Sequence, residues 1–296
     1  MDTIHRFLFE QLDIRGCLVR LGPAWRTMQA GRDYPPATVH LLGELAAVTA
    51  LIGSNLKTPG RVRFQLQGDG PLSLLVMDCD EQLRLRGMAR SAAAKTPDAG
   101  IGVPPTPSFP ASLPIGQLLG DGQLVLTLQT ANASPWQSVV PRVGKSVAEI
   151  FQHYLSQSEQ QPARLWLTAT ADTACGLFLQ KLPEAAAKDA DGWNRIEQLA
   201  ATVRAEELAL APEILLPRLF AEEEIRLFGS RHVTWHCPRD EEKIRNLLLS
   251  LGRDEVEEIL GEAETIAIAD EICGHEYRFG PEILDELFPP QGRLLH

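Results

Sequence analysis

Two cysteines in the last quarter of the chain are the residues whose type and spacing point most directly to chemistry. Cys237 lies in the segment WHCPR at 235–239, and Cys273 lies in the segment DEICGH at 270–275. A Cys-x-Cys motif followed by a Cys-x-x-Cys motif would form a zinc site with four thiolates, because soft thiolates at that spacing close a tetrahedron around the ion. Two cysteines alone are a weaker indication. A metal site, a redox switch and a remnant of both are therefore open interpretations.

The other cysteines and the apolar segments indicate the cellular compartment of the protein. Cys17, Cys79 and Cys175 lie in apolar, strand-like surroundings, so we interpret them as small buried side chains. The first residues include an acid and no basic stretch, which does not fit a secretory signal, and no apolar run approaches the ~18 residues of a membrane helix. We therefore expect a cytoplasmic protein, in which an odd total of five cysteines is not a disulfide framework.

Composition and motifs argue against nucleic acid binding and against catalysis. A net charge of -11 without any Lys/Arg cluster would repel a phosphate backbone. The sequence has no serine hydrolase elbow, P-loop, zinc protease motif or dinucleotide-binding motif, and His5, His40 and His153 have no nucleophile nearby in the sequence. We expect no enzymatic activity, no catalytic residue and no nucleotide cofactor.

The first domain, residues 1–183, is predicted to have an α+β fold. A helix should begin near Pro36 and be buried, because apolar residues cover nearly all of its sides. Short β-like runs then predict an antiparallel meander, whereas proline and small residues at 91–114 predict a loop. A capping box at 146–149 begins another helix. The expected strands are 61–67, 72–78, 82–89, 122–130, 163–171 and 174–182.

Residues 184–231 are predicted to be a helical linker. Ile196, Leu199, Ala200 and Val203 are spaced i, i+3, i+4 and i+7 and so share one face of an amphipathic helix. In one interpretation this segment is a helical lid packed on the first domain. In the other it is a linker that can dock or melt and so expose an apolar stripe.

Residues 232–296 are predicted to form a small, helix-rich third module. Helices are expected at 239–251 and up to about Leu260, followed by a TIAIA strand, the Cys273 turn, a YRF strand and a last helix. A module this small usually needs a staple, such as a metal ion.

Four longer stretches of the sequence are distinctive. They read TALIGSNLKTPG and LQGDGP within 49–71, LRGMAR at 85–90, IFQHYLSQSEQ at 150–160 and LFAEEEIRLF at 219–228. These stretches resemble the 33 kDa chaperonin family of redox-regulated heat-shock holdases, and the resemblance covers nearly the whole chain. It implies an ATP-independent stress-response chaperone with an antiparallel-sheet and helix domain, a helical linker and a C-terminal zinc-binding redox-switch module.

The resemblance also implies how such a chaperone is controlled. Four thiolates hold zinc while the cell is reducing; oxidation joins neighbouring cysteines, releases zinc and unfolds the module and linker, which exposes a client-binding surface. The four cysteine positions of the family fall on Cys237, Arg239, Asp270 and Cys273 in this chain. Because one member of each neighbouring pair is replaced, neither family disulfide can form. We therefore keep Cys237 and Cys273 as candidate metal ligands or redox-active residues, with zinc as a doubtful cofactor.

Three arrangements of this altered site are open. In the first, zinc survives on the two cysteines, Asp270 and a histidine, either His236 or His275. In the second, which we favour, Arg239 and Asp270 form an ion pair in place of zinc. In the third, the two cysteines join in a disulfide that the family does not use, so that oxidation tightens the module.

The function that these observations predict is that of a holdase with altered redox control. The expected partners are unfolded or partially unfolded client proteins and, in a homodimer, a second copy of the chain; neither nucleic acid nor a membrane is expected. The alternative is an interaction or adaptor protein that has lost the switch and serves particular partners.

Overall fold

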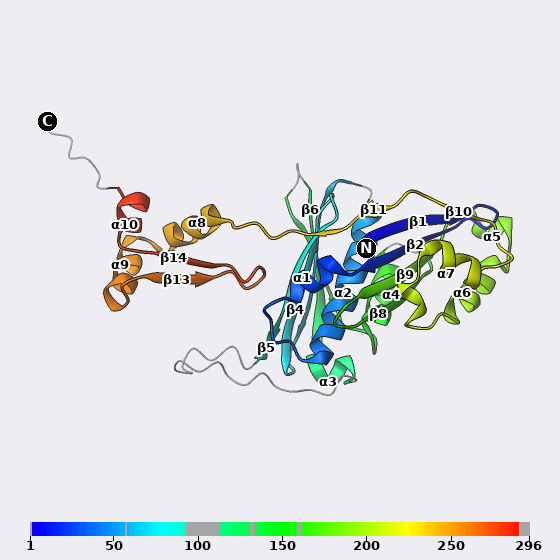
Figure 1. The fold of residues 1–296 in the computed structure, drawn as a ribbon, viewed down its shortest axis with the longest axis horizontal. Helices are drawn as coiled ribbons and strands as arrows, with labels where there is room; N and C mark the ends of the chain where they lie inside the picture. Colours follow the sequence, from blue (N-terminus) through cyan, green and yellow to red (C-terminus); the bar gives the residue numbers. More distant parts are fainter. Residues whose placement is uncertain (1, 57, 93–112, 131–133, 159–160, 290–296) are drawn as a thin grey trace. The chain divides into compact units, whose positions relative to one another are not determined.

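The chain has two structural units, residues 1–236 and 237–296, and each is described by itself. The computed structural model describes residues 2–56, 58–92, 113–130, 134–158 and 161–289. Both units combine helices with antiparallel strands, which confirms the α+β expectation (Figure 1). Residues 184–231, expected to form a separate linker, belong to the first unit. The three-domain division at 183/184 and 231/232 concerns independent folding and stays a prediction.

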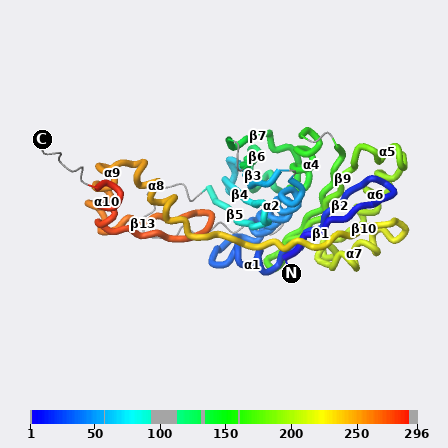
Figure 2. The backbone as a smooth tube through the Cα atoms, turned by 90° about the horizontal axis from the view of Figure 1, so that it is seen from above, coloured from blue at the N-terminus to red at the C-terminus, as the bar shows by residue number. Residues whose placement is uncertain are grey.

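The first sheet of unit 1 is antiparallel and joins strands from both ends of the unit. Its order is β10-β1-β2-β9-β8, and β11 pairs with β1. The tube in Figure 2 shows β10 running alongside β1. The strands are β1 (Thr3–Phe9), β2 (Ile14–Leu21), β8 (Ala163–Ala169), β9 (Ala174–Lys181), β10 (Ile225–Leu227) and β11 (Arg231–His232).

The second sheet of unit 1 contains the predicted meander. Strands β3, β4 and β5 follow one another as antiparallel neighbours, and a short parallel strand, β12, is added beside β5. The sheet has the order β12-β5-β4-β3-β6-β7. The strands are β3 (Gly60–Gly68), β4 (Leu72–Cys79), β5 (Arg84–Ser91), β6 (Gly122–Thr130), β7 (Trp136–Pro141) and β12 (Thr234–Trp235). Most of the predicted loop at 91–114 lies outside the described residues.

A long helix packs between these sheets and organises the main core. The helices of unit 1 are α1 (Pro23–Gln29), α2 (Pro36–Ser54), α3 (Ile115–Leu119), α4 (Val147–Ser158), α5 (Ala185–Lys188), α6 (Gly192–Ala201), the 3-10 helix η2 (Glu207–Ala209) and α7 (Pro212–Leu219). Helix α2 begins at Pro36 and is buried nearly all round, as predicted. It is long and apolar enough to cross a membrane, contrary to our expectation, but 78% of its apolar window is buried inside the protein. It is therefore a core helix of unit 1.

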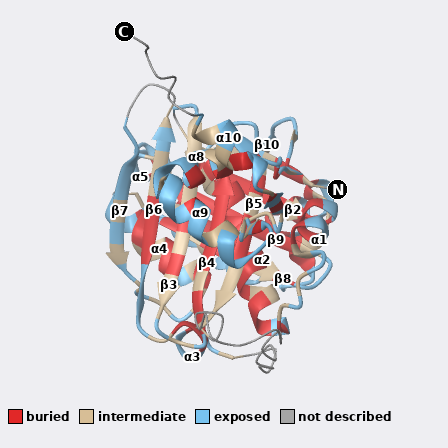
Figure 3. Ribbon diagram, turned by 90° about the vertical axis from the view of Figure 1, so that its left-hand side faces the viewer, coloured by how far each residue is buried: buried red, intermediate tan, exposed pale blue. Residues whose placement is uncertain are grey.

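The first sheet is buried on both faces. On β2, Cys17 and Val19 point to the core around α2, whereas Ile14 and Leu18 point to a second core beneath α6 and α7. Figure 3 accordingly shows β9 as a mostly buried strand. Strands that are buried on both faces lack a clean alternation of apolar and polar residues.

The predicted helical linker is broken into short pieces. Helices α5, α6 and α7 and the turn η2 replace one continuous stretch, and its end forms the edge strand β10. Ile196 and Ala200 are buried as the periodicity predicts, and Leu199 and Val203 pack partly buried beside them. A proline at the start of α7 explains one break, since proline is favoured in the first turn of a helix and disfavoured in its interior, although α7 also holds Pro217.

Unit 2 is a hairpin packed against three short helices (Figure 1). Its core is made by apolar side chains that include Ile244, Leu248, Val256 and Phe279. The elements are α8 (Glu241–Leu251), α9 (Arg253–Glu262), β13 (Ile266–Ala269), β14 (Glu276–Phe279) and α10 (Glu282–Leu287). All five follow the predicted order.

Candidate functional site

The two predicted site cysteines meet in unit 2. Cys237 is a buried residue just before α8, and Cys273 lies in the turn between β13 and β14. Their sulfurs are joined in a disulfide, with Cα atoms 5.7 Å apart, inside the usual range for such a bond. The structure therefore has the third arrangement, in which the two cysteines are joined in a disulfide.

Asp270 holds the turn that presents Cys273. One carboxylate oxygen accepts hydrogen bonds from the backbone amides of Ile272 (2.9 Å) and Cys273 (3.2 Å). The other lies 3.6 Å from Lys243 Nζ. Partial burial would raise the pKa of Asp270, but the amides and the Lys243 ammonium outweigh it and hold this pKa below the ordinary value. Asp270 therefore acts as an ionised turn-forming residue.

Arg239 is engaged elsewhere, so the favoured ion pair with Asp270 is wrong. Its guanidinium donates a 2.5 Å hydrogen bond to the Glu276 carbonyl and lies 5.0 Å from the centroid of the Tyr277 ring. The adjacent aromatic ring offers a planar cation a favourable surface, while Lys243 already neutralises Asp270.

The two histidines considered as ligands both form hydrogen bonds to backbone carbonyl groups. His275 Nε2 lies 2.8 Å from the Cys237 carbonyl oxygen, so it carries the proton that this oxygen accepts. This bond ties the cysteine before α8 to the hairpin. His236 belongs to unit 1, where its backbone amide donates to the Leu85 carbonyl.

The side chains around this disulfide do not fit a zinc ion. The two sulfurs are bonded to each other. Asp270 accepts hydrogen bonds from two backbone amides and pairs with a lysine, and His275 donates a hydrogen bond to a carbonyl oxygen. Among the residues that the structure describes, no group of three or more His, Cys, Asp or Glu side chains is arranged to hold a metal.

The remaining cysteines are structural. Cys17, Cys79 and Cys175 are free and buried, as their surroundings predict. Burial raises the pKa of Cys17 to about 11 and that of Cys79 to about 12, and it raises that of Cys175 as well. Raised pKa values keep these buried thiols protonated, which disfavours their reaction as thiolates.

A second candidate site is the face of the first sheet beneath α6 and α7, which we call the covered face. It presents Phe7 and Phe9 of β1, and the Phe9 ring packs edge-on against Phe220 at 5.0 Å between centroids. Ile196 and Leu215 of the covering helices are fully buried against it. Detachment of these helices would expose a wide apolar surface. Sequence reasoning missed this face, although the apolar run FLF at 7–9 was a signal for a buried strand.

Ion pairs, rather than many further apolar contacts, secure the ends of the covering segment. Arg195 of α6 pairs with Glu223 at 2.7 Å and with Asp189 at 3.1 Å. Glu207 of η2 pairs with Arg204 and Arg218 at 3.2 and 2.9 Å. Glu207 is buried, but the arginines of these pairs are exposed to solvent, which screens the attraction and keeps the contribution of the pairs to stability small. The covering segment therefore depends mainly on its buried apolar residues.

Comparison with known proteins relates the whole chain to one family. The sequence profile described as Hsp33 protein matches residues 2–280. The 33 kDa chaperonin of Nitrosococcus oceani is 38% identical over 294 residues, covering 98% of this chain and 95% of the relative. That of Vibrio cholerae is 33% identical and covers 100% and 99%. The crystal structure of the 33 kDa chaperonin from Thermotoga maritima has 21% identity and a TM-score of 0.80, with 97% of each chain covered.

Proposed function

Because the chain belongs to the Hsp33 protein family, whose members are named as chaperones, we propose that it is an ATP-independent holdase. It binds unfolding or oxidatively damaged proteins in the cytoplasm and prevents their aggregation. Its partners are therefore non-native polypeptides. The names of the relatives indicate a chaperone rather than an enzyme.

The covered face is the client-binding surface of this proposal. A holdase needs a large apolar surface that is hidden in the resting protein, since a permanently exposed one would cause self-association. The single observation that supports this assignment is the second core of unit 1, where short helices cover the aromatic residues of β1. Helices as short as α5, α6 and α7 depend on tertiary packing for their stability. They can therefore detach as the temperature rises without unfolding of the sheet.

Control by oxidant is reversed in this proposal. Peroxide takes two electrons and two protons from the Cys237 and Cys273 thiols, which gives one disulfide and two molecules of water. The bond closes a separation of 36 residues, which stabilises unit 2 by about 4 kcal/mol in the chain-entropy model. Oxidation thus tightens unit 2, and melting of the covering helices activates the chaperone.

Suppression of aggregation tests the holdase assignment. Chemically unfolded citrate synthase would be diluted into buffer with the full chain at 25 and 43 °C, with and without peroxide, and light scattering would be followed. We expect near-stoichiometric suppression at 43 °C and no additional suppression with peroxide at 25 °C. No suppression under any condition would refute the holdase and favour an adaptor for particular partners. Activation by peroxide at 25 °C would refute the reversed control alone.

A further inference from the structure

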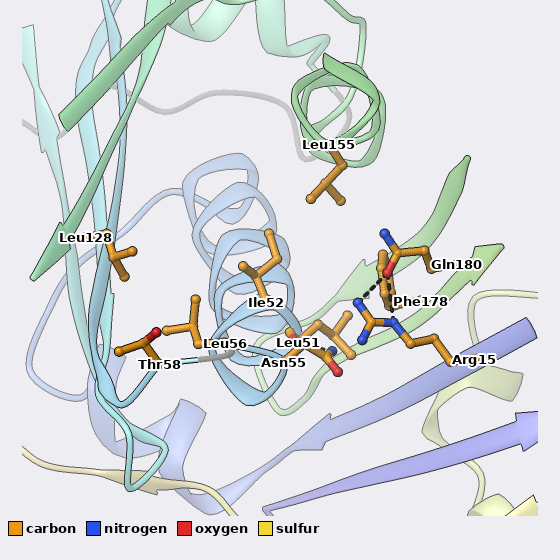
Figure 4. Close-up of a pocket in the computed structure, with 10 residues that line it drawn as sticks. All are labelled: Arg15, Leu51, Ile52, Asn55, Leu56, Thr58, Leu128, Leu155, Phe178 and Gln180. Carbon is orange, nitrogen blue, oxygen red and sulfur yellow. Dashed lines mark hydrogen bonds between the residues drawn. The ribbon is translucent and has the colours of Figure 1, made fainter. Parts of the chain in front are cut away.

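A pocket in unit 1 combines an apolar interior with one positively charged end. It lies where the end of α2 meets α4, β6 and the strands β2 and β9, and it has a volume of about 210 Å³ (Figure 4). Leu51, Leu155 and Phe178 form its buried wall. Arg15 and Gln180 lie together at one side.

The guanidinium of Arg15 has hydrogen-bonding capacity that the protein leaves unused. Its Nε and Nη2 atoms both donate to the side-chain oxygen of Gln180, with the Nε contact at 2.8 Å. A guanidinium has five N–H donors, so the Nη1 and Nη2 edge is left over. Within the described part of the chain, the hydrogen bonds of the Arg15 side chain go to Gln180 alone, and neither a carboxylate nor an acceptor for Nη1 is found beside it. The positive charge of this side chain is therefore unpaired, and Gln180 fixes its orientation.

The guanidinium of Arg15 does not donate to the carbonyl groups at the nearby end of α2. The last carbonyl groups of the helix are already accepting hydrogen bonds: the Leu51 carbonyl from Ser54 and Asn55 side chains at 2.8 Å each, and the Ile52 carbonyl from the Asn55 amide at 3.0 Å. Arg15 therefore is not a cap of this helix. Its free edge matches a carboxylate, which arginine binds through two parallel hydrogen bonds.

We propose that this pocket binds a medium-chain aliphatic carboxylate. The carboxylate is held by the free edge of Arg15, and the chain lies against Leu51, Leu155 and Phe178. The size is suitable, because an apolar cavity of roughly 150 Å³ accommodates one benzene ring, so the larger space in this protein suits a chain of about eight carbons. The charged end selects against an alcohol of the same length.

Calorimetric titration of the full-length protein with a series of fatty acids tests the proposal. From butanoate to octanoate, we expect an affinity gain approaching fourfold for each added methylene. The gain should then level off once the cavity is full. Affinity that keeps rising at the same rate beyond dodecanoate would overturn the proposal, because it would indicate non-specific adsorption to an open surface.

Two variants separate the charged end from the apolar wall. Arg15→Gln should lower the affinity for octanoate by about tenfold or more and leave the affinity for octanol unchanged. Leu155→Trp should fill the cavity and abolish binding of both. Arg20→Gln, on the same strand but outside the pocket, is the matched control and should bind octanoate like the wild type. Equal weakening by Arg15→Gln and Arg20→Gln would overturn the proposal. If Arg15→Gln fails to fold, the chain-length series and the preference for octanoate over octanol in the wild type decide the question.

Discussion

At the scale of residues, Cys237 and Cys273 remain a pair because their neighbours hold them together. Asp270 forms the turn that presents one cysteine, and the His275 side chain holds the backbone of the other. The local structure around these residues is therefore suited to a single disulfide.

Counting of thiols tests this pair. Peroxide should lower the number of thiols that react with a maleimide reagent after denaturation from five to three, because only Cys237 and Cys273 join. Cys237→Ser should abolish the associated mobility shift on a non-reducing gel, whereas Cys175→Ser should keep it. A Cys237→Ser protein that shifts like the wild type would show that another pair is oxidised.

Glu44 of α2 should make the stability of unit 1 depend on pH. Burial raises the pKa of this carboxyl to about 7, partly opposed by His40, whose Nε2 atom lies 3.4 Å away. The folded protein thus holds this proton more tightly than the unfolded chain, in which the pKa is near 4.5. The resulting stability is complete below about pH 4.5 and is lost as the pH rises through about 7.

Glu44→Gln should remove this dependence. Unfolding by urea between pH 5 and 8 should show a loss of stability that is smaller than in the wild type by on the order of 1–3 kcal/mol. Glu222→Gln, at an exposed position of unit 1, is the control and should follow the wild type. If the stability of the wild type and that of Glu44→Gln changed equally with pH, the raised pKa of Glu44 would be contradicted.

At the scale of elements, α7 offers a direct test of the covered face. Leu215 is fully buried against the sheet, while the preceding residue, Ile214, is 57% exposed. Leu215→Ala should cost about 2–5 kcal/mol of packing in the covering segment. Holdase activity should then appear at a lower temperature than in the wild type.

Hydrogen exchange distinguishes local detachment from general unfolding. In Leu215→Ala the amides of α6 and α7 should exchange faster while those of β2 and β9 stay protected. Ile214→Ala should match the wild type in both exchange and activity. Faster exchange in the helices of Leu215→Ala without any gain in holdase activity would show that the covered face does not bind clients.

At the scale of the whole molecule, the chain should unfold in two parts. All five tryptophans lie in residues 1–236, and unit 2 contains Tyr277 as its only tyrosine among the described residues. Tryptophan fluorescence therefore reports unit 1 alone, whereas far-ultraviolet circular dichroism reports both units.

A reductant should move only the transition of unit 2. Loss of the disulfide should destabilise this unit by about 4 kcal/mol, because its unfolded chain regains loop entropy. The circular dichroism curve should show this shift, and the fluorescence curve should not. A Cys237→Ser protein should be insensitive to the reductant, and a shift of the tryptophan transition by reductant in the wild type would contradict the division into two parts.

Much of the architecture follows from local patterns. Periodicity and turn residues predicted α2, the meander of β3 to β5, β8, β9 and the order of elements in unit 2. The edge strand β10 was not predicted, because its pairing with β1 joins Ile225–Leu227 to Phe7–Phe9, more than two hundred residues away. The local strand preference of a segment of three residues is too weak to predict such pairing.

The sequence by itself determined the family, the α+β class and the two cysteines that could still react. Long distinctive stretches and residue types are properties of the chain that need no knowledge of contacts. Only the tertiary structure decided that Arg239 stacks on Tyr277, that Lys243 neutralises Asp270, and that the two sulfurs meet. Each outcome depends on which partners the packed hairpin and α8 bring within a few ångströms, and ionic or aromatic partners of similar strength cannot be ranked without those distances.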